Sequence, residues 1–198
     1  MMSRAYRDGV DNIPYMGGVP NVFLMQLLLW TLVFTTTGTF AQQLLLPNET
    51  SIFSFKTVGG KTMMLAKDKS DKYLIYRFGI QDKIELEFPL KTKDSWKQFR
   101  YNFYLRGGGK QNAGLDVDNL RFTNKKTTYV VYAAYSAGEP GAEGEPDTEE
   151  SYTVGIIIHQ PGKEDVEITG NPETVVGSLK EFRTNGQVTI DWDAALEF

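Results

Sequence analysis

The sequence contains no cysteine and a single histidine, His159, among its 198 residues. The lack of cysteine excludes disulfide bonds, thiolate nucleophiles and cysteine metal ligands. Zinc sites need several histidine, cysteine or carboxylate ligands, so we predict no metal site of this kind. His159 ends an apolar segment beside Gln160 and Pro161, and no G-x-S-x-G nucleophile motif accompanies it. We therefore expect a structural role for this histidine.

The sequence also lacks an excess of basic residues. It has 21 lysines and arginines against 25 aspartates and glutamates, a net charge of −4 at pH 7. No global positive field therefore favours nucleic acid as a partner. The P-loop and dinucleotide-binding glycine patterns are absent as well, and we predict no cofactor. Aromatic residues, in contrast, make up 13% of the chain, which excludes a disordered protein.

Only one long apolar run is present, VFLMQLLLWTLVF at residues 22–34. It is shorter than the roughly 20 residues that a membrane-spanning helix needs. The small and hydroxylated residues after it place Thr39 and Ala41 at the −3 and −1 positions before Gln42, a pattern typical of signal-peptide cleavage. We predict a signal peptide at residues 1–41, a secreted or periplasmic mature protein, and no stable membrane span after cleavage.

Two features of this N-terminal segment depart from the usual signal-peptide pattern. Arg4 and Arg7 lie far upstream of the apolar run, and no lysine or arginine adjoins it. Met16 and Met25 are therefore alternative starts of the chain. An uncleaved anchor helix is the alternative to cleavage.

From residue 42 onward, strand-like patterns recur about every 10 to 15 residues, with turn sequences between them. The turns with the clearest chemistry lie at residues 58–61, 79–82, 124–126 and 160–163. Residues 174–182 fit either a strand or a short helix. The spacing predicts an all-β fold, a single antiparallel β-sandwich or barrel-like domain at residues 42–198.

The alternation of apolar and polar residues predicts which side chains face the core. Residues 83–88 read KIELEF and residues 99–106 read FRYNFYLR, so every second side chain in each strand is apolar. From these two strands we predict six core side chains: Ile84, Leu86, Phe88, Tyr101, Phe103 and Leu105.

The segment at residues 138–150, GEPGAEGEPDTEE, contains six acidic residues, two prolines and no basic residue. Such a composition cannot bury apolar surface, so we expect an exposed loop or linker. It is a candidate domain boundary. We favour one domain, because the short remainder after it would be marginally stable alone.

The most specific stretch is WKQFRYNFYLRGGGKQNAGLDVDN at residues 96–119, a strand pattern that ends in three consecutive glycines. Consecutive glycines indicate either a turn that only glycine fits or a close approach of the backbone to a partner. Exposed tyrosine and arginine side chains are typical of recognition surfaces. We predict binding residues in this strand and loop: Arg100, Tyr104, Arg106, Gly107, Gly108, Gly109, Lys110, Asn112 and Asp116.

Carboxylates offer an alternative. Glu85 or Glu87, paired with Asp116 or Asp118, would supply the two carboxylates of a carbohydrate-active hydrolase, provided that they face each other in a cleft. Alternating lysine and glutamate is also the ordinary wet face of a strand. The sequence leaves open whether the loop with Asp116 and Asp118 binds calcium, although it does not match an EF-hand.

Three segments carry a resemblance to known proteins. They are KYLIYRFGIQDKIELEFP at residues 72–89, FRYNFYLRGGGKQNAGLD at 99–116 and NLRFTN at 119–124. Here the chain resembles uncharacterised exported bacterial proteins in which YRFG, RGGG-x-x-NAGLD and a later GSL segment recur in that order. The resemblance covers residues 51–182 and implies an exported, mostly β protein with no activity to carry over.

Two functions of different classes follow from these patterns. The first is a secreted or periplasmic, non-catalytic binding or inhibitory module that presents the arginine- and tyrosine-rich strand and the glycine loop to a protein or glycan. Inhibition of a cell-wall hydrolase is one version of it. The second is the carbohydrate-active hydrolase. A cleft with facing carboxylates would favour the hydrolase, whereas an exposed patch would favour the binding module.

Overall fold

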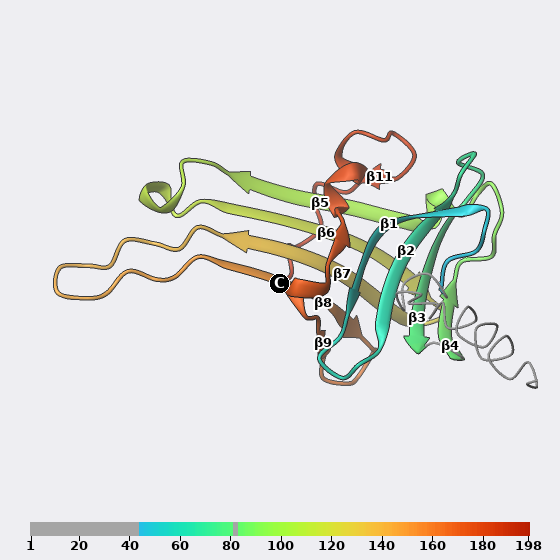
Figure 1. Cartoon of the computed structure of the whole chain (residues 1–198), viewed down its shortest axis with the longest axis horizontal. Coiled ribbons are helices and arrows are strands. Elements are labelled where there is room, and N and C mark those ends of the chain that lie inside the picture. Colours follow the sequence, from blue (N-terminus) through green and yellow to red (C-terminus); the bar gives the residue numbers. More distant parts are fainter. Residues whose placement is uncertain (1–43, 81–82) are drawn as a thin grey trace, which may run out of the picture. The chain divides into compact units, whose positions relative to one another are not determined.

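Two β-sheets make up the part of the chain that the computed structural model describes, residues 44–80 and 83–198 (Figure 1). All of these residues belong to one compact unit. The predicted signal peptide at residues 1–41 and the cleavage site before Gln42 lie outside the described residues. Within the described ranges, no helix is long and apolar enough to cross a membrane.

The five-stranded sheet has the order β10-β1-β2-β3-β4, and its neighbouring strands are antiparallel. Its strands are β1 (Glu49–Lys56), β2 (Thr62–Asp68), β3 (Leu74–Ile80), β4 (Lys83–Phe88) and β10 (Val176–Gly177). The turn predicted at residues 58–61 lies between β1 and β2, and β3 and β4 pair as the hairpin predicted around residues 79–82 requires.

The six-stranded sheet has the order β11-β5-β6-β7-β8-β9 and is antiparallel except for the parallel pair of β11 with β5. Its strands are β5 (Phe99–Arg106), β6 (Leu115–Asn124), β7 (Thr127–Ser136), β8 (Ser151–His159), β9 (Val166–Thr169) and β11 (Thr189–Ile190). Four short 3-10 helices are also described: η2 (Trp96–Gln98), η3 (Lys110–Asn112), η4 (Pro172–Thr174) and η5 (Leu179–Arg183).

Aromatic side chains from both sheets fill the space between them. The ring of Phe122 lies 4.8 Å from that of Tyr76, 4.6 Å from that of Phe88 and 5.0 Å from that of Tyr129, between ring centroids. Tyr76 and Phe88 belong to the five-stranded sheet, whereas Phe122 and Tyr129 belong to the six-stranded sheet. The two sheets thus share one core. The prediction of an all-β sandwich or barrel-like domain is confirmed, and the fold is the sandwich.

Four of the six predicted core side chains are buried or pack partly buried against this core: Tyr101, Leu86, Phe88 and Phe103. The prediction is wrong for Ile84 and Leu105, which are 45% and 59% exposed. A β-bulge in the β3–β4 pair sets Ile84 opposite Gly79, so Ile84 turns to the outer face. Leu105 lies near the end of β5, where that strand extends past the five-stranded sheet.

The outer face of the five-stranded sheet carries a second apolar cluster, formed by Leu44, Leu45, Met64, Ala66, Tyr73 and Ile75. Beside it lies a buried ion pair, in which the Arg77 and Glu49 side chains are 1% and 0% exposed. Two nitrogens of Arg77 donate to the two carboxylate oxygens of Glu49, at 2.6 and 2.8 Å. Arg77 also donates to the Leu44 carbonyl at 2.7 Å and to Glu87 at 2.7 Å. The guanidinium is therefore well satisfied despite its burial.

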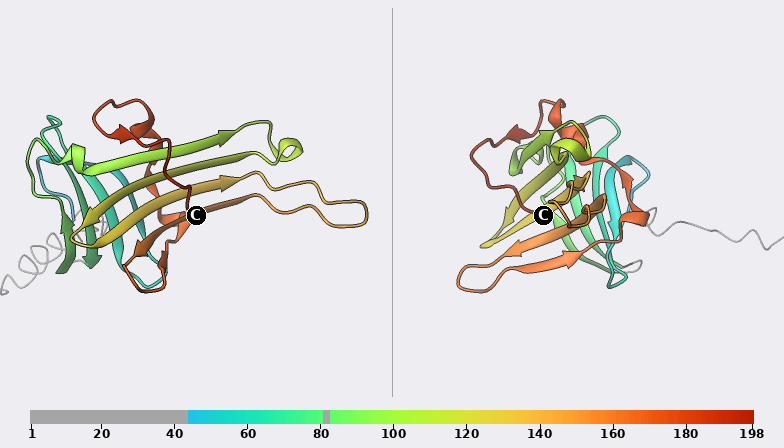
Figure 2. Two further views of the ribbon diagram at one scale, coloured as in Figure 1. Left: turned by 180° about the vertical axis from the view of Figure 1, so that it is seen from behind. Right: turned by 90° about the vertical axis from the view of Figure 1, so that its left-hand side faces the viewer.

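Strands β5 to β8 extend beyond the five-stranded sheet (Figures 1 and 2). At their ends lie two long connections, residues 107–114 between β5 and β6 and residues 137–150 between β7 and β8. We call these strand ends and connections the projecting end. It contains the glycine loop and the acidic segment that the sequence singles out.

Candidate functional site

The glycine connection of the projecting end is held by its own contacts. The Asn112 side-chain amide donates to the Gly107 carbonyl at 2.7 Å, and Arg106 Nε donates to the Ala113 carbonyl at 2.8 Å. Gly108 and Gly109 have φ angles of +96° and +60°. A Cβ added at Gly108 would come within 2.8 Å of Asn112 Cβ. The backbone conformation at Gly108 and Gly109 therefore requires glycine, and the side chains of Arg106 and Asn112 stabilise the turn by hydrogen bonds to its carbonyls.

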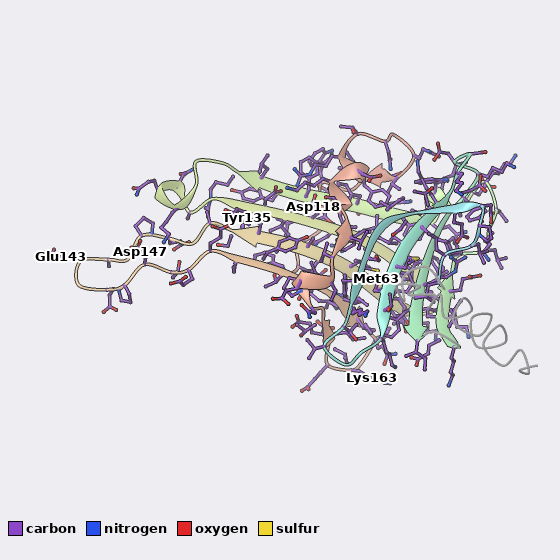
Figure 3. The ribbon with its side chains drawn as sticks, in the orientation of Figure 1. Met63, Asp118, Tyr135, Glu143, Asp147 and Lys163 are labelled. Atoms are coloured by element: carbon purple, nitrogen blue, oxygen red, sulfur yellow. The ribbon has the colours of Figure 1, made fainter. Side chains whose placement is uncertain are left out.

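The acidic connection forms a second ordered hairpin beside it. The Thr148 amide donates to the Glu139 carbonyl at 3.0 Å, and the Gly141 amide donates to Asp147 Oδ1 at 3.0 Å. Lys110 Nζ lies 3.3 Å from Asp147 Oδ2, which links the two hairpins. Figure 3 shows Glu143 and Asp147 at the outer part of this hairpin. Besides Asp147, which pairs with Lys110, the segment carries five carboxylates, and these give this end of the molecule a negative charge.

Two of the predicted binding residues lie on the outer face of β5. Arg100 Nη1 donates to the carbonyls of Lys97 and Phe99, at 2.7 and 3.0 Å. Tyr104 is 41% exposed. Register places Arg100 opposite Arg121, and Tyr104 opposite Val117. Tyr104 therefore remains available to a ligand, whereas part of the hydrogen-bonding capacity of Arg100 is used locally.

Asp116 belongs to β6 and points to the opposite, inner face of the sheet, the face that carries Leu120 and Phe122. In register with it across the four strands lie Leu105 of β5, Tyr135 of β7 and Tyr152 of β8. We call these four side chains the shelf. Leu105 is 59% exposed and Tyr152 is 40% exposed. The shelf is thus an apolar and aromatic surface with one carboxylate in it (Figure 3 labels Tyr135).

A network of charged side chains borders the shelf. Arg183 of η5 contacts Asp116, and its Nε and Nη2 donate to Asp118 Oδ1 at 2.9 and 2.8 Å. Lys180 Nζ lies 2.6 Å from Asp116 Oδ2. The Tyr101 hydroxyl donates to Asp118. The guanidinium carbon of Arg183 also lies 4.6 Å from the centre of the Phe103 ring. These contacts hold η5 against β5 and β6 of the six-stranded sheet.

The two aspartates of this network have different electrostatic environments. Burial acts to raise the pKa of Asp116, but Lys180 and Arg183 outweigh it and hold that pKa below its ordinary value. Burial raises the pKa of Asp118 above its ordinary value, against the opposing effects of Tyr101 and Arg183. Asp116 therefore carries a negative charge at neutral pH, and Lys180, whose side chain is 54% exposed, neutralises it at the edge of the shelf.

The structure divides the predicted binding residues among three places. Arg100 and Tyr104 lie on the outer face, residues 106–110 and Asn112 in the hairpin tip, and Asp116 on the inner face. Sequence reasoning missed the partners of Asp116, namely Lys180 and Arg183, and the aromatic residues Tyr135 and Tyr152. Asp116 is separated from Leu120 and Phe122 by an even number of residues along β6. This spacing places it on the same face of the strand as these two apolar residues, and it was visible in the sequence. No local pattern indicated that η5 covers it.

The carboxylates proposed for a hydrolase are not brought together. Glu87 Oε2 accepts from Arg77 on the outer face of the five-stranded sheet, and Glu85 pairs with Lys61 at 2.6 Å. Asp116 and Asp118 lie on the inner face of the other sheet and contact cationic side chains. Among the described residues, no group of three or more histidine, cysteine or carboxylate side chains is placed to hold a metal ion.

Comparison of the chain with known protein families, with curated proteins and with solved structures gave no significant match. The resemblance to exported bacterial proteins therefore stays a prediction.

Proposed function

We propose that the protein is a non-catalytic binding module that acts outside the cytoplasm and contacts a protein or glycan ligand through its projecting end. The single observation that carries the proposal is the shelf. Four strands continue past the sheet that covers the rest of their inner face, and they keep Leu105 and Tyr152 exposed there. Leaving these side chains in water is unfavourable, and a ligand that covers them would gain free energy.

The chemistry of the shelf suits recognition. Tyr135 and Tyr152 offer flat aromatic surfaces for a sugar ring or an apolar side chain, and Lys180, whose side chain is 54% exposed, offers a charged hydrogen-bond donor beside them. The neighbouring acidic hairpin adds a negative field that favours a cationic partner and speeds its association. A cationic cell-wall hydrolase bound and inhibited by the projecting end is the most specific version of this proposal.

A retention experiment tests the proposal. The purified protein is incubated with insoluble peptidoglycan, with chitin and with lysozymes, and both co-sedimentation and inhibition of lysis are measured. We expect retention or inhibition with the wild type. We expect the Leu105→Ala/Tyr152→Ala double variant to lose about tenfold or more in affinity, as removal of interface anchors usually does.

The matched control is the Val58→Ala/Val166→Ala double variant. Val58 and Val166 are 75% and 54% exposed but lie in the β1–β2 turn and in β9, outside the projecting end. The control should bind as the wild type does. Absence of both retention and inhibition in the wild type, or an equal loss in the two double variants, would contradict the proposal.

A further inference from the structure

After β11, residues 191–198 cross the outer face of the six-stranded sheet, from the β5 edge toward β8 (Figure 2). We call this segment the strap. It is not a strand of the sheet. The Asp191 amide donates to the Tyr101 carbonyl at 2.7 Å, and the Trp192 ring lies 5.4 Å from that of Phe103. Side chains of the sheet hold the rest of the strap. This face lies opposite to the shelf, so the inference drawn from it is independent of the proposed function.

Two buried asparagines bind the backbone of the strap. Asn102 of β5 is 3% exposed, and its amide donates to the carbonyls of Ala194 and Ala195 at 3.1 and 3.2 Å. Asn119 of β6 is fully buried. Its amide donates to the Glu197 carbonyl at 2.7 Å, and its oxygen accepts from the Glu197 amide at 2.8 Å. A side-chain amide that bonds both backbone groups of one residue recognises the backbone at that position, whatever the side chain.

The Glu197 side chain adds a charge-dependent contact. Its carboxylate lies 2.6 Å from His159 Nε2 and 3.4 Å from Arg121 Nη2, and Arg121 Nη2 also donates to the Ala195 carbonyl at 2.6 Å. Arg121 Nε is buried and has no hydrogen-bond partner among the described residues. The Arg121 guanidinium thus keeps one donor without a partner among the described residues. Between the strap and Ile157, a shallow pocket of about 430 Å³ remains unfilled.

His159 lies between carboxylates from two other segments. Asp165, in the turn before β9, is 2.7 Å from Nδ1, and Glu197 of the strap faces Nε2. Glu167 of β9 lines the same pocket. Arg121 of β6 contacts the Glu197 carboxylate, which in turn contacts His159. Partial burial acts to lower the pKa of His159, but Asp165 and Glu197 outweigh it and raise that pKa above its ordinary value. The imidazolium therefore holds the strap most firmly at mildly acidic pH.

We propose that Asn102, Asn119, Arg121 and His159 form a binding site for a short peptide segment that carries a glutamate, and that residues 194–197 of the chain occupy this site. Most of the contacts are to backbone groups, and the glutamate supplies the selective one. An acidic peptide from a partner with the same backbone geometry fits the site once the strap leaves it.

The strap competes with any added peptide for the site, so peptide binding can be measured only when the strap is weakened. Because the strap is tethered, it acts at an effective concentration of the order of millimolar, which masks the site from peptides in solution. A Glu197→Ala substitution weakens the strap without changing any residue of the site. The apparent affinity for an added peptide then rises in proportion to the fraction of open sites.

The experiment uses the full chain and a synthetic peptide of sequence DWDAALEF, with the side-chain amide signals of Asn102 and Asn119 in nitrogen-15 NMR spectra as reporters. At about pH 6 we expect the peptide to bind Glu197→Ala at least about tenfold more tightly than the wild type. A peptide with glutamine in place of its glutamate should bind the same variant about tenfold more weakly, since it loses the charge-assisted contact. Affinity for the glutamate peptide should fall as the pH rises through the raised pKa of His159.

In a Glu197→Ala/His159→Ala double variant, the preference for the glutamate peptide should shrink to the part that Arg121 supplies, and this pH dependence should be lost. In the wild type, independently of any substitution, protection of the Glu197 amide from hydrogen exchange should decrease between about pH 6 and pH 8.5, after correction for intrinsic exchange. Failure of Glu197→Ala to bind the peptide, equal binding of its glutamate and glutamine forms by that variant, or pH-independent protection in the wild type would each overturn the proposal.

Discussion

Arg77 shows how a single charged residue is accommodated inside this protein. Its side chain is 1% exposed, and its hydrogen bonds go to Glu49, Glu87 and the Leu44 carbonyl. Glu49 in turn accepts from the Tyr73 hydroxyl at 3.0 Å and from the Leu46 amide at 2.9 Å. Hydrogen bonds to protein groups thus replace the water that both charged side chains would bind in the unfolded chain. A pair of this kind is costly to break from one side, because the remaining charge stays buried.

Replacement of Arg77 by alanine should therefore lower the free energy of unfolding by about 3–5 kcal/mol, since it leaves Glu49 without its counter-ion. Urea denaturation followed by tryptophan fluorescence measures this loss. The control is Glu87→Ala. Glu87 contacts the same guanidinium, but its side chain is 37% exposed, so its removal should cost less than about 1 kcal/mol. Similar losses in the two variants would contradict the prediction.

The pH dependence of the same variant provides a second test. Burial acts to raise the pKa of Glu49, but Arg77 and the other hydrogen-bond donors outweigh it and lower the pKa below its ordinary value. A lowered carboxyl pKa adds stability that is present above the pKa of the unfolded state and is lost as the pH falls through the pKa of the folded state. The stability of the wild type should therefore decrease over this acidic range more steeply than that of Arg77→Ala.

At the scale of elements, the backbone conformation of the β5–β6 hairpin accounts for its consecutive glycines. Of the three glycines, Gly108 and Gly109 adopt positive φ angles and Gly107 does not, and Asn112 packs directly against Gly108. Gly107 has open space around its Cα and no positive φ. The three glycines are therefore not equivalent.

Gly108→Ala should destabilise the protein by about 1–2 kcal/mol, because alanine is strained at this φ and its Cβ would meet Asn112. For a chain of this length the melting temperature should fall by a few degrees, which thermal unfolding monitored by circular dichroism detects. Gly107→Ala is the matched control, and we expect a change within about 0.5 kcal/mol. Equal effects at both positions would show that the hairpin adopts another backbone geometry.

At the scale of the whole molecule, Phe122 joins the two sheets, since its ring contacts aromatic rings from β3, β4 and β7. Phe122→Ala should remove these contacts and leave a cavity between the sheets, with a loss of about 3–5 kcal/mol. Calorimetry or urea denaturation provides the measurement. Leu90→Ala, at a position that is 82% exposed, should change the stability by less than about 0.5 kcal/mol. A small effect of Phe122→Ala would mean that the sheets do not depend on this shared core.

Some of this architecture was predictable from the sequence because it depends on neighbouring residues. The period-two patterns at residues 83–88 and 99–106 predicted two strands, and β4 and β5 have the same bounds. Glycine- and asparagine-containing turns predicted four hairpins that the sheets contain. Residues 174–182 were ambiguous because their conformation is mixed, with β10 followed by η5.

The sites depend on contacts between residues that are far apart in the sequence. Arg183 reaches Asp116 across 67 positions, and Glu197 reaches His159 across 38. The sequence by itself determined an all-β fold, a sandwich or a barrel, and a strand that ends in a glycine hairpin, since alternation and turn chemistry act locally. Only the tertiary structure decided that Leu105 lies beyond the opposite sheet, that η5 neutralises Asp116 and that the strap covers Asn119. These outcomes depend on how far each strand extends and on which segments pack across the two sheets, and no local pattern encodes either property.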